Sequence, residues 1–471
     1  MHKFFHRGAP WARATLAAFG LAGLIGLLAL SGCVNGEGIQ SSSSDGAAAD
    51  TAATDSATAH RQAAVQNVKA AVPVAGDVLI AGGANASNQS LATAEFFDPS
   101  SGQFLATGTA SSSRAGASAA AFSPTQVLLA GGFSGEALIK NYSLDLNGSM
   151  LSSAEIFDES TGGFSRVGRM ATARMGFTAT TLNSGKVLVA GGLDNHGNVL
   201  DTAELYDPVA QKFVPVANAM SDRRMLHTAT LLASGKVLVV GGATNLSGDT
   251  TNSADLYDPA SNSFTATTFP MDHQRAAHAA TLFVSGPMAG RVLITGGVGG
   301  SSFFFKDSSA ELFDPVSQEF VLLTTFMNEA RALHTATLLD DGTVLLAGGF
   351  SGTVAISGGM LSGASGLTSN SAEVFDPSNG DFNCVGGFNG ATLRCNPSMS
   401  SARAGHTATL LTTGPTPHRV LIAGGIGAFD PAAHGKSLSS AELFNPASGG
   451  SFRATGAMTT ARALHTATLL H

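Results

Sequence analysis

The chain is poor in charged residues and in indole and phenol groups. Charged residues make up 12% of its 471 residues, about half of the ~25% usual in globular proteins. It has one tryptophan, three tyrosines, three cysteines and no dense run of lysine or arginine. This composition and a formal net charge of -8 argue against nucleic acid as its partner. The low charge also argues against long solvated helices, while a hydrophobic content of 44% argues against disorder throughout.

Glycine, by contrast, is abundant. The 57 glycines are about 12% of the residues, where ~7% is typical. Combined with many alanines and threonines, this composition predicts an all-β chain of short strands and tight turns.

The N-terminal segment has the layout of an export signal. Lys3, Arg7 and Arg13 precede an apolar run over residues 16–30, which is shorter than the ~20 residues of a spanning helix. The run ends in Leu30-Ser31-Gly32-Cys33 and resembles the lipobox of bacterial lipoproteins. The resemblance implies cleavage before Cys33 and lipidation of its thiol and amine. An ordinary signal peptide with an incidental cysteine is the alternative.

These features predict three parts: a lipoprotein signal peptide (residues 1–32), a lipidated Cys33 with a disordered tether (33–72), and a folded domain (73–471). The tether is rich in Ser, Ala and Asp and has too little apolar surface to fold. Because residues 1–32 carry three basic and no acidic residues, the mature net charge is 22 - 33 = -11. Val34 after the cysteine favours the outer membrane or cell surface, by resemblance to lipoprotein sorting. The only expected membrane contact is the lipid anchor.

The folded part repeats one unit seven times. Each unit has an apolar strand that ends in Gly-Gly, and then a strand with an acid followed by an aromatic residue two positions later. The Gly-Gly pairs begin at Gly82, Gly131, Gly191, Gly241, Gly296, Gly348 and Gly424. The acids are Glu95, Glu155, Glu204, Asp255, Glu311, Glu373 and Glu442.

Two further markers complete the unit. A second aromatic follows seven or eight residues after the first, at Phe104, Phe164, Phe213, Phe264, Phe320, Phe382 and Phe452. An arginine then opens a strand rich in Thr, Ala and Leu, at Arg114, Arg174, Arg224, Arg275, Arg331, Arg403 and Arg462.

Four short strands per ~50 residues are the signature of a repeat-built β-propeller. With Gly-Gly closing the second strand, the unit resembles the kelch repeat. The resemblance covers residues 73–471 and implies a seven-bladed kelch-type β-propeller. No Arg-led strand precedes Val78, and the chain ends with one, over residues 465–470. We therefore expect the C-terminal strand to complete the first blade.

Propeller strands are lettered A to D from the axis outward. Antiparallel order then places the A–B and C–D turns on one face, the turn face, and the B–C and D–A connections on the other, the loop face. The large insertions fall on the loop face, where binding residues tend to lie. Candidate ligand-binding residues outside the repeat pattern are Lys140, Asp145, Asp194, His196, Lys306, Asp307, His434 and Lys436.

The repeated arginines allow two interpretations. They could form a basic ring at the mouth of the central channel and bind a carboxylate or phosphate. Alternatively, each arginine pairs with the acid of its own unit and is structural, which the one-to-one match favours. Histidines three residues after five of the arginines are replaced by Ala117 and Phe177 in the other two units. That replacement predicts a packed position, and it argues against a metal ring.

Cys384 and Cys395 lie eleven positions apart in a glycine-rich insertion, and in an exported chain they predict a disulfide. A zinc pair is weaker, because the insertion has no histidine or acid to complete the ligands. Residues 145–148 and 194–201 offer oxygen ligands for calcium, but neither has a complete twelve-residue calcium loop. Ordinary turns explain both. We expect no metal and no cofactor.

Two functions remain. The favoured one is a membrane-tethered binding or scaffolding module for an envelope protein or an extracellular glycan, acting through the loop face. The alternative is a periplasmic sugar mutarotase or epimerase with its site at the channel mouth. Some kelch-type proteins are copper enzymes that need tyrosine ligands and a Tyr–Cys cross-link. Here Tyr206 and Tyr257 occupy repeat positions that carry Phe elsewhere, and Cys384 and Cys395 share one loop, so that chemistry is not expected.

Overall fold

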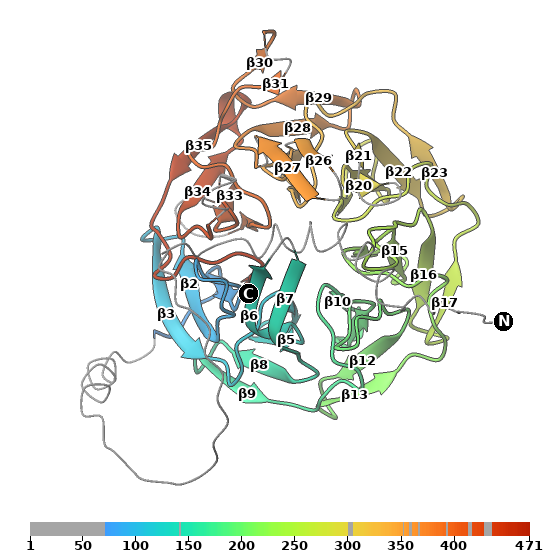
Figure 1. Cartoon of the computed structure of the whole chain (residues 1–471), viewed down its shortest axis with the longest axis vertical. Helices are drawn as coiled ribbons and strands as arrows, with labels where there is room; N and C mark the ends of the chain where they lie inside the picture. The colour runs from blue at the N-terminus through green and yellow to red at the C-terminus, as the bar shows by residue number, and fades with distance from the viewer. Residues whose placement is uncertain are drawn as a thin grey trace, which may run out of the picture.

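The computed structural model describes residues 71–471 apart from 141–142, 300–304, 352, 358–359, 366–367, 392–393, 413–416 and 428–435. The signal segment, Cys33, most of the tether and His434 therefore lie outside the described residues. Seven four-stranded antiparallel sheets surround a central axis as blades (Figure 1). The described chain contains no helix that is long and apolar enough to cross a membrane.

Each blade contributes strands A to D in that order from the axis. Blade 1 is β36 (Thr466–Leu469), β1 (Val78–Ala81), β2 (Thr93–Asp98) and β3 (Gln103–Thr109). Blade 2 is β4 (Ser118–Ser123), β5 (Gln126–Ala130), β8 (Ala154–Asp158) and β9 (Gly163–Arg166). Blade 3 is β10 (Thr178–Thr181), β11 (Val187–Ala190), β12 (Ala203–Asp207) and β13 (Lys212–Pro215).

The remaining blades follow the same order. Blade 4 is β14 (Thr228–Leu231), β15 (Val237–Val240), β16 (Ala254–Asp258) and β17 (Ser263–Ala266). Blade 5 is β18 (Ala279–Leu282), β19 (Val292–Thr295), β22 (Ala310–Asp314) and β23 (Glu319–Leu322). Blade 6 is β24 (Thr335–Leu338), β25 (Val344–Ala347), β28 (Ala372–Asp376) and β29 (Asp381–Cys384). Blade 7 is β32 (Thr407–Leu411), β33 (Arg419–Ala423), β34 (Ala441–Asn445) and β35 (Ser451–Ala454).

The hydrophobic core lies between adjacent blades. Strand B is buried along its whole length, as in β11 with the sequence VLVA, because both faces of the sheet pack against neighbours. Leu188 and Leu205 of blade 3, for example, lie in one cluster with Val237, Val239 and Tyr257 of blade 4. The continuous apolar strand B of each repeat is explained by this two-sided burial.

The aromatic pair of each repeat joins strands C and D. Cross-strand partners such as Tyr206 and Phe213 have ring centroids 5.0 Å apart. Corresponding pairs in the other blades are 4.7–5.2 Å apart. Phenylalanine in strand D therefore packs within its own blade against the aromatic residue of strand C.

The Gly-Gly pair is required where strand B leaves the sheet. Gly191 and Gly192 have φ values of 66° and 101°, a region that L side chains rarely adopt. A Cβ on Gly191 would lie 2.4 Å from the carbonyl oxygen of Arg224 in the next blade. Close contact between blades thus excludes a side chain at this position.

The C-terminal strand closes the ring, as the repeat phase predicts. β36 pairs with β1 in antiparallel register, with Val78 opposite Leu469 and Ala81 opposite Thr466. Blade 1 therefore contains three strands from the start of the domain and one from its end.

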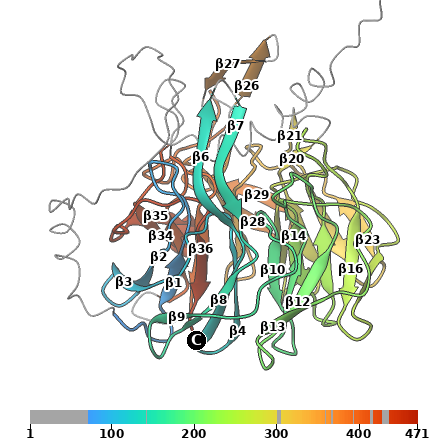
Figure 2. The ribbon, with the colours of Figure 1, turned by 60° about the horizontal axis from the view of Figure 1, so that its bottom comes forward.

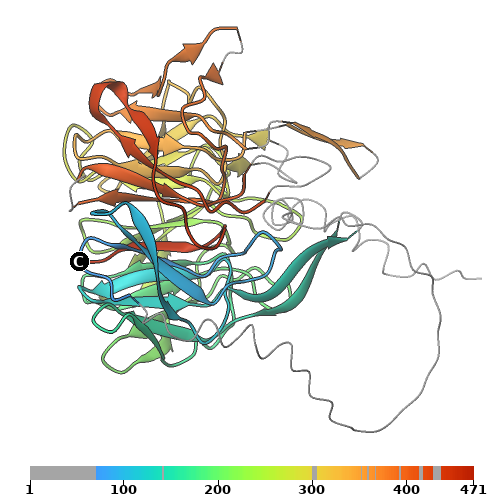
Figure 3. The ribbon, with the colours of Figure 1, turned by 90° about the vertical axis from the view of Figure 1, so that its left-hand side faces the viewer.

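Four two-stranded hairpins extend the loops. Three are B–C insertions: β6 (Phe133–Lys140) with β7 (Ser143–Met150), β20 (Val298–Gly299) with β21 (Phe305–Lys306), and β26 (Thr353–Ser357) with β27 (Met360–Ser365). The fourth pairs β30 (Phe388–Asn389) with β31 (Arg394–Cys395) in a D–A connection. β6–β7 and β26–β27 rise from the same face (Figures 2 and 3). The A–B turns are short, except those of blades 5 and 7 (283–291 and 412–418).

Deleting residues 465–471 tests the closure. The deletion removes strand A of blade 1 and leaves β1 without its inner partner. We expect cooperative unfolding to be lost, or its midpoint to fall on the order of 10 °C, in a thermal scan followed by circular dichroism. Deletion of His471 alone is the control and should change little. An unchanged midpoint after the longer deletion would show that the ring does not depend on β36.

Candidate functional site

The seven repeated arginines are buried and paired. Each has 0% exposure, and each donates to the acid of strand C in its own blade. The N···O distances are 2.6–3.0 Å in the pairs Arg114–Glu155, Arg174–Glu204, Arg224–Asp255, Arg275–Glu311, Arg331–Glu373, Arg403–Glu442 and Arg462–Glu95. The structure therefore has the structural pairing, and a ring of free guanidinium groups at the channel mouth is absent from the described residues.

Arg174 shows how the pair connects two blades. Its guanidinium donates to the carbonyls of Gly191 (2.7 Å) and Thr202 (3.0 Å) in its own blade. Its backbone carbonyl accepts from Gly132 of the preceding blade at 2.9 Å. Burial lowers the pKa of Arg174, and the charge of Glu204 opposes that shift. The arginine is thus a joint between blades, held inside the protein.

The channel mouth on the loop face is formed by backbone and apolar side chains. The residue two positions after each arginine has left-handed backbone, and its N–H donates to the same residue of the preceding blade. The seven bonds close a ring through Gly116, Gly176, Leu226, Ala277, Leu333, Gly405 and Leu464 at N···O distances of 2.8–3.3 Å. With ~5 Å between bonded backbones, such a heptagon is about 11 Å across before side chains are added. The ring itself carries no charged residue.

Four members of this ring are strained. Leu226, Ala277, Leu333 and Leu464 have φ values of 53–55°, a conformation that costs a non-glycine residue of order 1–3 kcal/mol. The glycines of the other three blades occupy the same position without this cost. The side chains of Leu226, Leu333 and Leu464 are partly buried and pack against apolar clusters beside the ring, a contact that glycine would not make.

The five repeated histidines are packed between blades. His227, His278, His406 and His465 each bond through Nε2 to the hydroxyl of a threonine in strand A of the preceding blade, at 2.9–3.0 Å. In blade 5 that threonine is replaced by Ala279, and the hydroxyl comes instead from Thr295, directly across on β19. The distance from Nε2 of His334 to this hydroxyl is 2.9 Å. The position is polar, packed and structural.

Burial holds these imidazoles neutral. It lowers the pKa of His227, His334 and His465 to about 3, and nearby arginines add to the shift. His278 and His406 have pKa values well below the usual range for the same reason. The histidines are therefore not available as proton donors at neutral pH.

One sector of the mouth departs from the repeat. Four positions before the acid of strand C, the B–C connection carries leucine in blades 1, 2, 3 and 7, and a polar residue in blades 4 to 6. The same three consecutive blades carry a charged or ionisable residue two positions before the arginine, where the others have serine or threonine. The resulting pairs are Thr251–Asp222 (2.7 Å), Asp307–His273 (2.8 Å) and Ser369–Glu329 (2.8 Å). We name these six residues the polar sector.

His273 is the most accessible ionisable member of this sector. Its side chain is 43% exposed, and Nδ1 lies 2.8 Å from Asp307, which is 16% exposed. The pKa of Asp307 is lowered by Arg275 and by hydrogen bonds from Ser309 and His273, against the effect of burial. Nδ1 is thereby fixed, and Nε2 is the ring nitrogen left for a ligand. Arg223, beside Asp222, is exposed near the same mouth.

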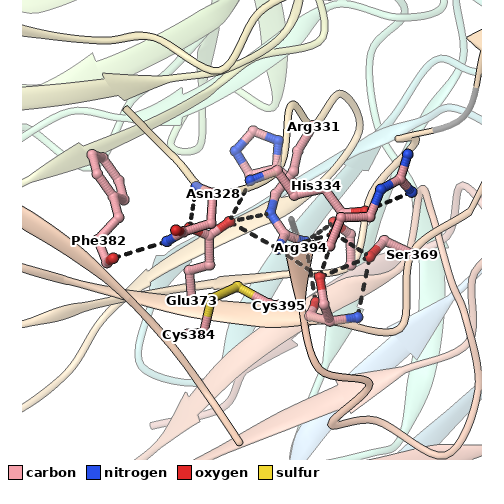
Figure 4. Close-up of polar contacts among 12 residues, drawn as sticks. Asn328, Arg331, His334, Ser369, Glu373, Phe382, Cys384, Arg394 and Cys395 are labelled. Atoms are coloured by element: carbon pink, nitrogen blue, oxygen red, sulfur yellow. Dashed lines mark hydrogen bonds and ion pairs between the residues drawn. A yellow bond between two sulfur atoms is a disulfide. The ribbon is translucent and has the colours of Figure 1, made fainter. Parts of the chain in front are cut away.

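Glu329 connects the polar sector to the disulfide insertion. Its carboxylate accepts from Ser369 and Ser371, lies 3.4 Å from Arg331, and is reached by Arg394 at 3.5 Å (Figure 4). Arg394 precedes Cys395, which forms a disulfide with Cys384 at a Cα–Cα distance of 5.2 Å. The insertion thus places an exposed cation over a buried carboxylate.

The candidate residues taken from the sequence are scattered. Asp194 accepts from the backbone of His196 and Asn198 at 2.8 Å, as in an ordinary turn, and these bonds lower its pKa against burial. Lys436 is exposed. Lys140, Asp145 and Lys306 lie in β6, β7 and β21. Only Asp307 belongs to the polar sector.

Sequence reasoning missed Asp222, His273 and Glu329. The signal that could have found them is a position-by-position comparison of the seven units, in which these residues replace serine or threonine.

The described residues contain no group of three or more His, Cys, Asp or Glu that could hold a metal ion. Tyr206 and Tyr257 are 0% exposed and pack on Phe213 and Phe264. Their place inside the blades does not fit a tyrosine-ligated copper centre.

Seven four-stranded blades, each with a buried arginine–acid pair, define a repeat-built β-propeller. Residues 173–220, which run from before Arg174 through strand D of blade 3, match the kelch motif. Because the other six blades repeat its strands and markers, the fold is that of a seven-bladed, kelch-type β-propeller.

Two solved structures are similar in fold. A fungal alcohol oxidase of the AA5 family, in complex with copper, has a TM-score of 0.55 and 16% identity, over 78% of this chain and 71% of its own. The structure of YjhT has a TM-score of 0.49 and 12% identity, over 72% of this chain and 97% of its own. No curated protein matches the sequence.

The buried pair predicts a large effect of a single substitution. Glu204→Leu leaves the charge of Arg174 uncompensated inside blade 3 and should lower the free energy of unfolding by about 3–5 kcal/mol. Urea denaturation followed by circular dichroism measures this loss.

The matched control is Lys186→Met in the same blade. Lys186 pairs with Asp207 at 3.0 Å with 42% of its side chain exposed, so its removal should change stability by no more than ~1 kcal/mol. Equal effects of the two substitutions would contradict a structural role for the buried pair.

The neutral histidines predict acid sensitivity. Their folded pKa values lie below the unfolded value of 6.5, so the unfolded chain binds more protons below that pH. Their contribution is complete above pH 6.5 and is lost as pH falls toward 3, by up to ~1.4 kcal/mol per pH unit for each histidine. His227→Phe, which copies Phe177 of blade 3, should reduce the slope of unfolding free energy against pH by that amount. Parallel slopes for the two proteins would contradict neutral burial of His227.

Proposed function

We propose that the protein is a binding module that holds an envelope protein or an extracellular glycan on its loop face. The kelch-type propeller is generally a protein-binding scaffold, which supports this class of function. The observation that carries the proposal is the polar sector, where three consecutive blades replace a repeated leucine and a small polar residue by hydrogen-bonded polar pairs.

The repeat pattern supports assigning this sector to binding. The residues common to all blades are buried and hold the blades together, so they are explained by the fold. The polar sector is not needed for the fold, because blades 1, 2, 3 and 7 have the same architecture with leucine in its place. It lies on the face from which the β6–β7 and β26–β27 hairpins rise (Figure 2).

The chemistry of the sector suits a polar ligand. Asp222 supplies a carboxylate acceptor and His273 supplies an oriented imidazole. Arg394, which lies outside the sector and contacts Glu329, adds an exposed cation beside it. Ordered acceptors and donors beside an apolar ring are suited to a sugar or to a polar peptide segment. A lipid anchor on Cys33 and a tether would place this face in the cell envelope or at the cell surface.

A second candidate function is sugar mutarotation or epimerisation at the same mouth. It is favoured by His273, whose Nδ1 is held by Asp307 so that Nε2 could accept a proton from a sugar hydroxyl. No Ser–His–Asp order or other catalytic set accompanies it in the described residues. Binding is therefore the preferred function.

The test restores the repeat in one blade. The double variant His273→Thr/Asp307→Leu gives blade 5 the residue types of blade 3. We expect thermal stability near that of the unaltered protein, and at least ~10-fold weaker binding to any glycan found on an array or envelope protein found by in-cell cross-linking. A loss of tenfold corresponds to ~1.4 kcal/mol, the size of one or two hydrogen bonds.

Val316→Ser is the matched control, because Val316 is 92% exposed in a C–D turn on the opposite face. It should leave binding unchanged. Equal binding by the double variant and the unaltered protein would exclude the polar sector. If the unaltered protein converts a sugar and the double variant does not, the enzymatic candidate would be supported instead.

A further inference from the structure

A second departure from the repeat occurs where the ring closes. The residue before the first valine of strand B is Gln126, Lys186, Lys236, Arg291, Thr343 and Arg419 in blades 2 to 7. In blade 1 this residue is Asp77. The turn after strand C begins with Asp or Asn followed by proline in six blades, and blade 2 has Glu159 in place of the proline. Both departures introduce a carboxylate.

Backbone contacts bring these two positions into one region. Leu470 donates to the carbonyl of Asp77 at 2.9 Å, His471 donates to Pro124 at 3.3 Å, and Glu159 donates to Thr125 at 2.9 Å. The end of the C-terminal strand therefore lies between the start of β1 and the turns of blade 2. This region is on the turn face, opposite the hairpins (Figure 2).

Both carboxylates are buried, and neither forms a salt bridge within the described residues, although the exposed imidazole of His471 lies near Glu159. Asp77 is 3% exposed and accepts a hydrogen bond from the backbone of Val74. Glu159 is 8% exposed, and its Oε2 has no hydrogen-bond partner among the described residues. Burial, with the charges of Asp98 and Glu159, raises the pKa of Asp77 to about 6. Burial also raises the pKa of Glu159, although exposed His471 opposes this effect.

In blades 3, 4 and 5 the residue that corresponds to Asp77 is basic and pairs with the aspartate at the end of strand C. Lys186 pairs with Asp207 at 3.0 Å, Lys236 with Asp258 at 3.0 Å, and Arg291 with Asp314 at 3.2 Å. In blade 1 the corresponding partner of Asp98 is Asp77, which has the opposite charge to those lysines and arginine. Asp77 has one hydrogen bond, from Val74, and Oε2 of Glu159 has none among the described residues. Burying carboxylates with so few partners is costly, and a bound cation would lower this cost.

We propose that Asp77 and Glu159 bind a divalent metal ion, Ca²⁺ by their chemistry, where the C-terminal strand closes the ring. Carboxylate oxygens are ligands of choice for Ca²⁺, which also accepts backbone carbonyls and water in a flexible shell. Since no third His, Cys, Asp or Glu joins these two in the described residues, carbonyls and water complete the shell. That requirement disfavours zinc. The ion would tie the start of β1 to blade 2 across the seam.

The test measures thermal unfolding of the full chain at pH 7.5 in EDTA, in CaCl₂ and in MgCl₂. Calcium sites of extracellular modules have dissociation constants of ~10⁻⁴–10⁻³ M, so 10 mM CaCl₂ should raise the midpoint by a few degrees. Calorimetric titration of the folded protein with CaCl₂ should show one site. Absence of both responses would overturn the proposal.

Substitutions locate the site. Asp77→Asn/Glu159→Gln should abolish the calcium-dependent shift, whatever its effect on the metal-free midpoint. Glu159→Pro, which restores the residue of the other six blades, is a second variant in case the first is poorly folded. Asp207→Asn in blade 3 is the matched control and should keep the full shift. An equal calcium shift in the unaltered protein and in either seam variant would place the ion elsewhere and overturn the assignment.

Discussion

The buried arginine–acid pair is the interaction on which the rest of the structure depends. A guanidinium group inside a protein is costly unless its charge is paired and most of its donors are hydrogen-bonded. The terminal nitrogens of Arg174 bond to Glu204 and to two carbonyls of its own blade, while its Nε has no partner among the described residues. The backbone carbonyl of Arg174 accepts from the preceding blade. The geometry of one blade therefore fixes where the next begins. Seven repetitions of this joint produce a ring rather than an open stack.

The same contact between blades explains the Gly-Gly pair after strand B and the ring of backbone hydrogen bonds at the channel mouth. Because the arginine carbonyl of one blade must approach the Gly-Gly turn of the preceding one, no Cβ fits there. Beyond the arginine the chain turns through left-handed backbone and donates to its counterpart in the preceding blade, which closes the ring of seven hydrogen bonds. Leucine at three of these positions carries a conformational cost that glycine would avoid. The packing of these leucine side chains against neighbouring apolar clusters accompanies that cost.

Much of the fold could be predicted from the sequence, because the same sequence markers recur in each of the seven units. The Gly-Gly pair, the paired acid, the two aromatics and the arginine fixed the number of blades, and the position of the last arginine at Arg462 indicated closure by β36. The polar sector was harder to predict. Its residues come from two different connections of each blade, one B–C and one D–A. Only the pairing of His273 with Asp307, or of Asp222 with Thr251, in the structure shows that the replaced residues of the two connections contact each other. For the arginines, the one-to-one match with the acids favoured structural pairing over anion binding. Sequence position gives the blade end but not the direction of a side chain, so the pairs themselves are seen only in the structure.

In a repeat protein, each ionisable residue can be compared with the residues at the equivalent position of the other repeats. The five buried histidines have lowered pKa values, but they recur from blade to blade and bond to threonine hydroxyls, so a perturbed pKa here marks packing. Asp77 has a raised pKa and occurs once, where other blades carry cations or neutral residues. Protonation destabilises the fold through the histidines and relieves repulsion at Asp77, so the two sets respond to acid in opposite directions. Within one propeller, an ionisable residue that recurs at the same position in several blades is explained by the fold. An ionisable residue that occurs in one blade only is a candidate for binding.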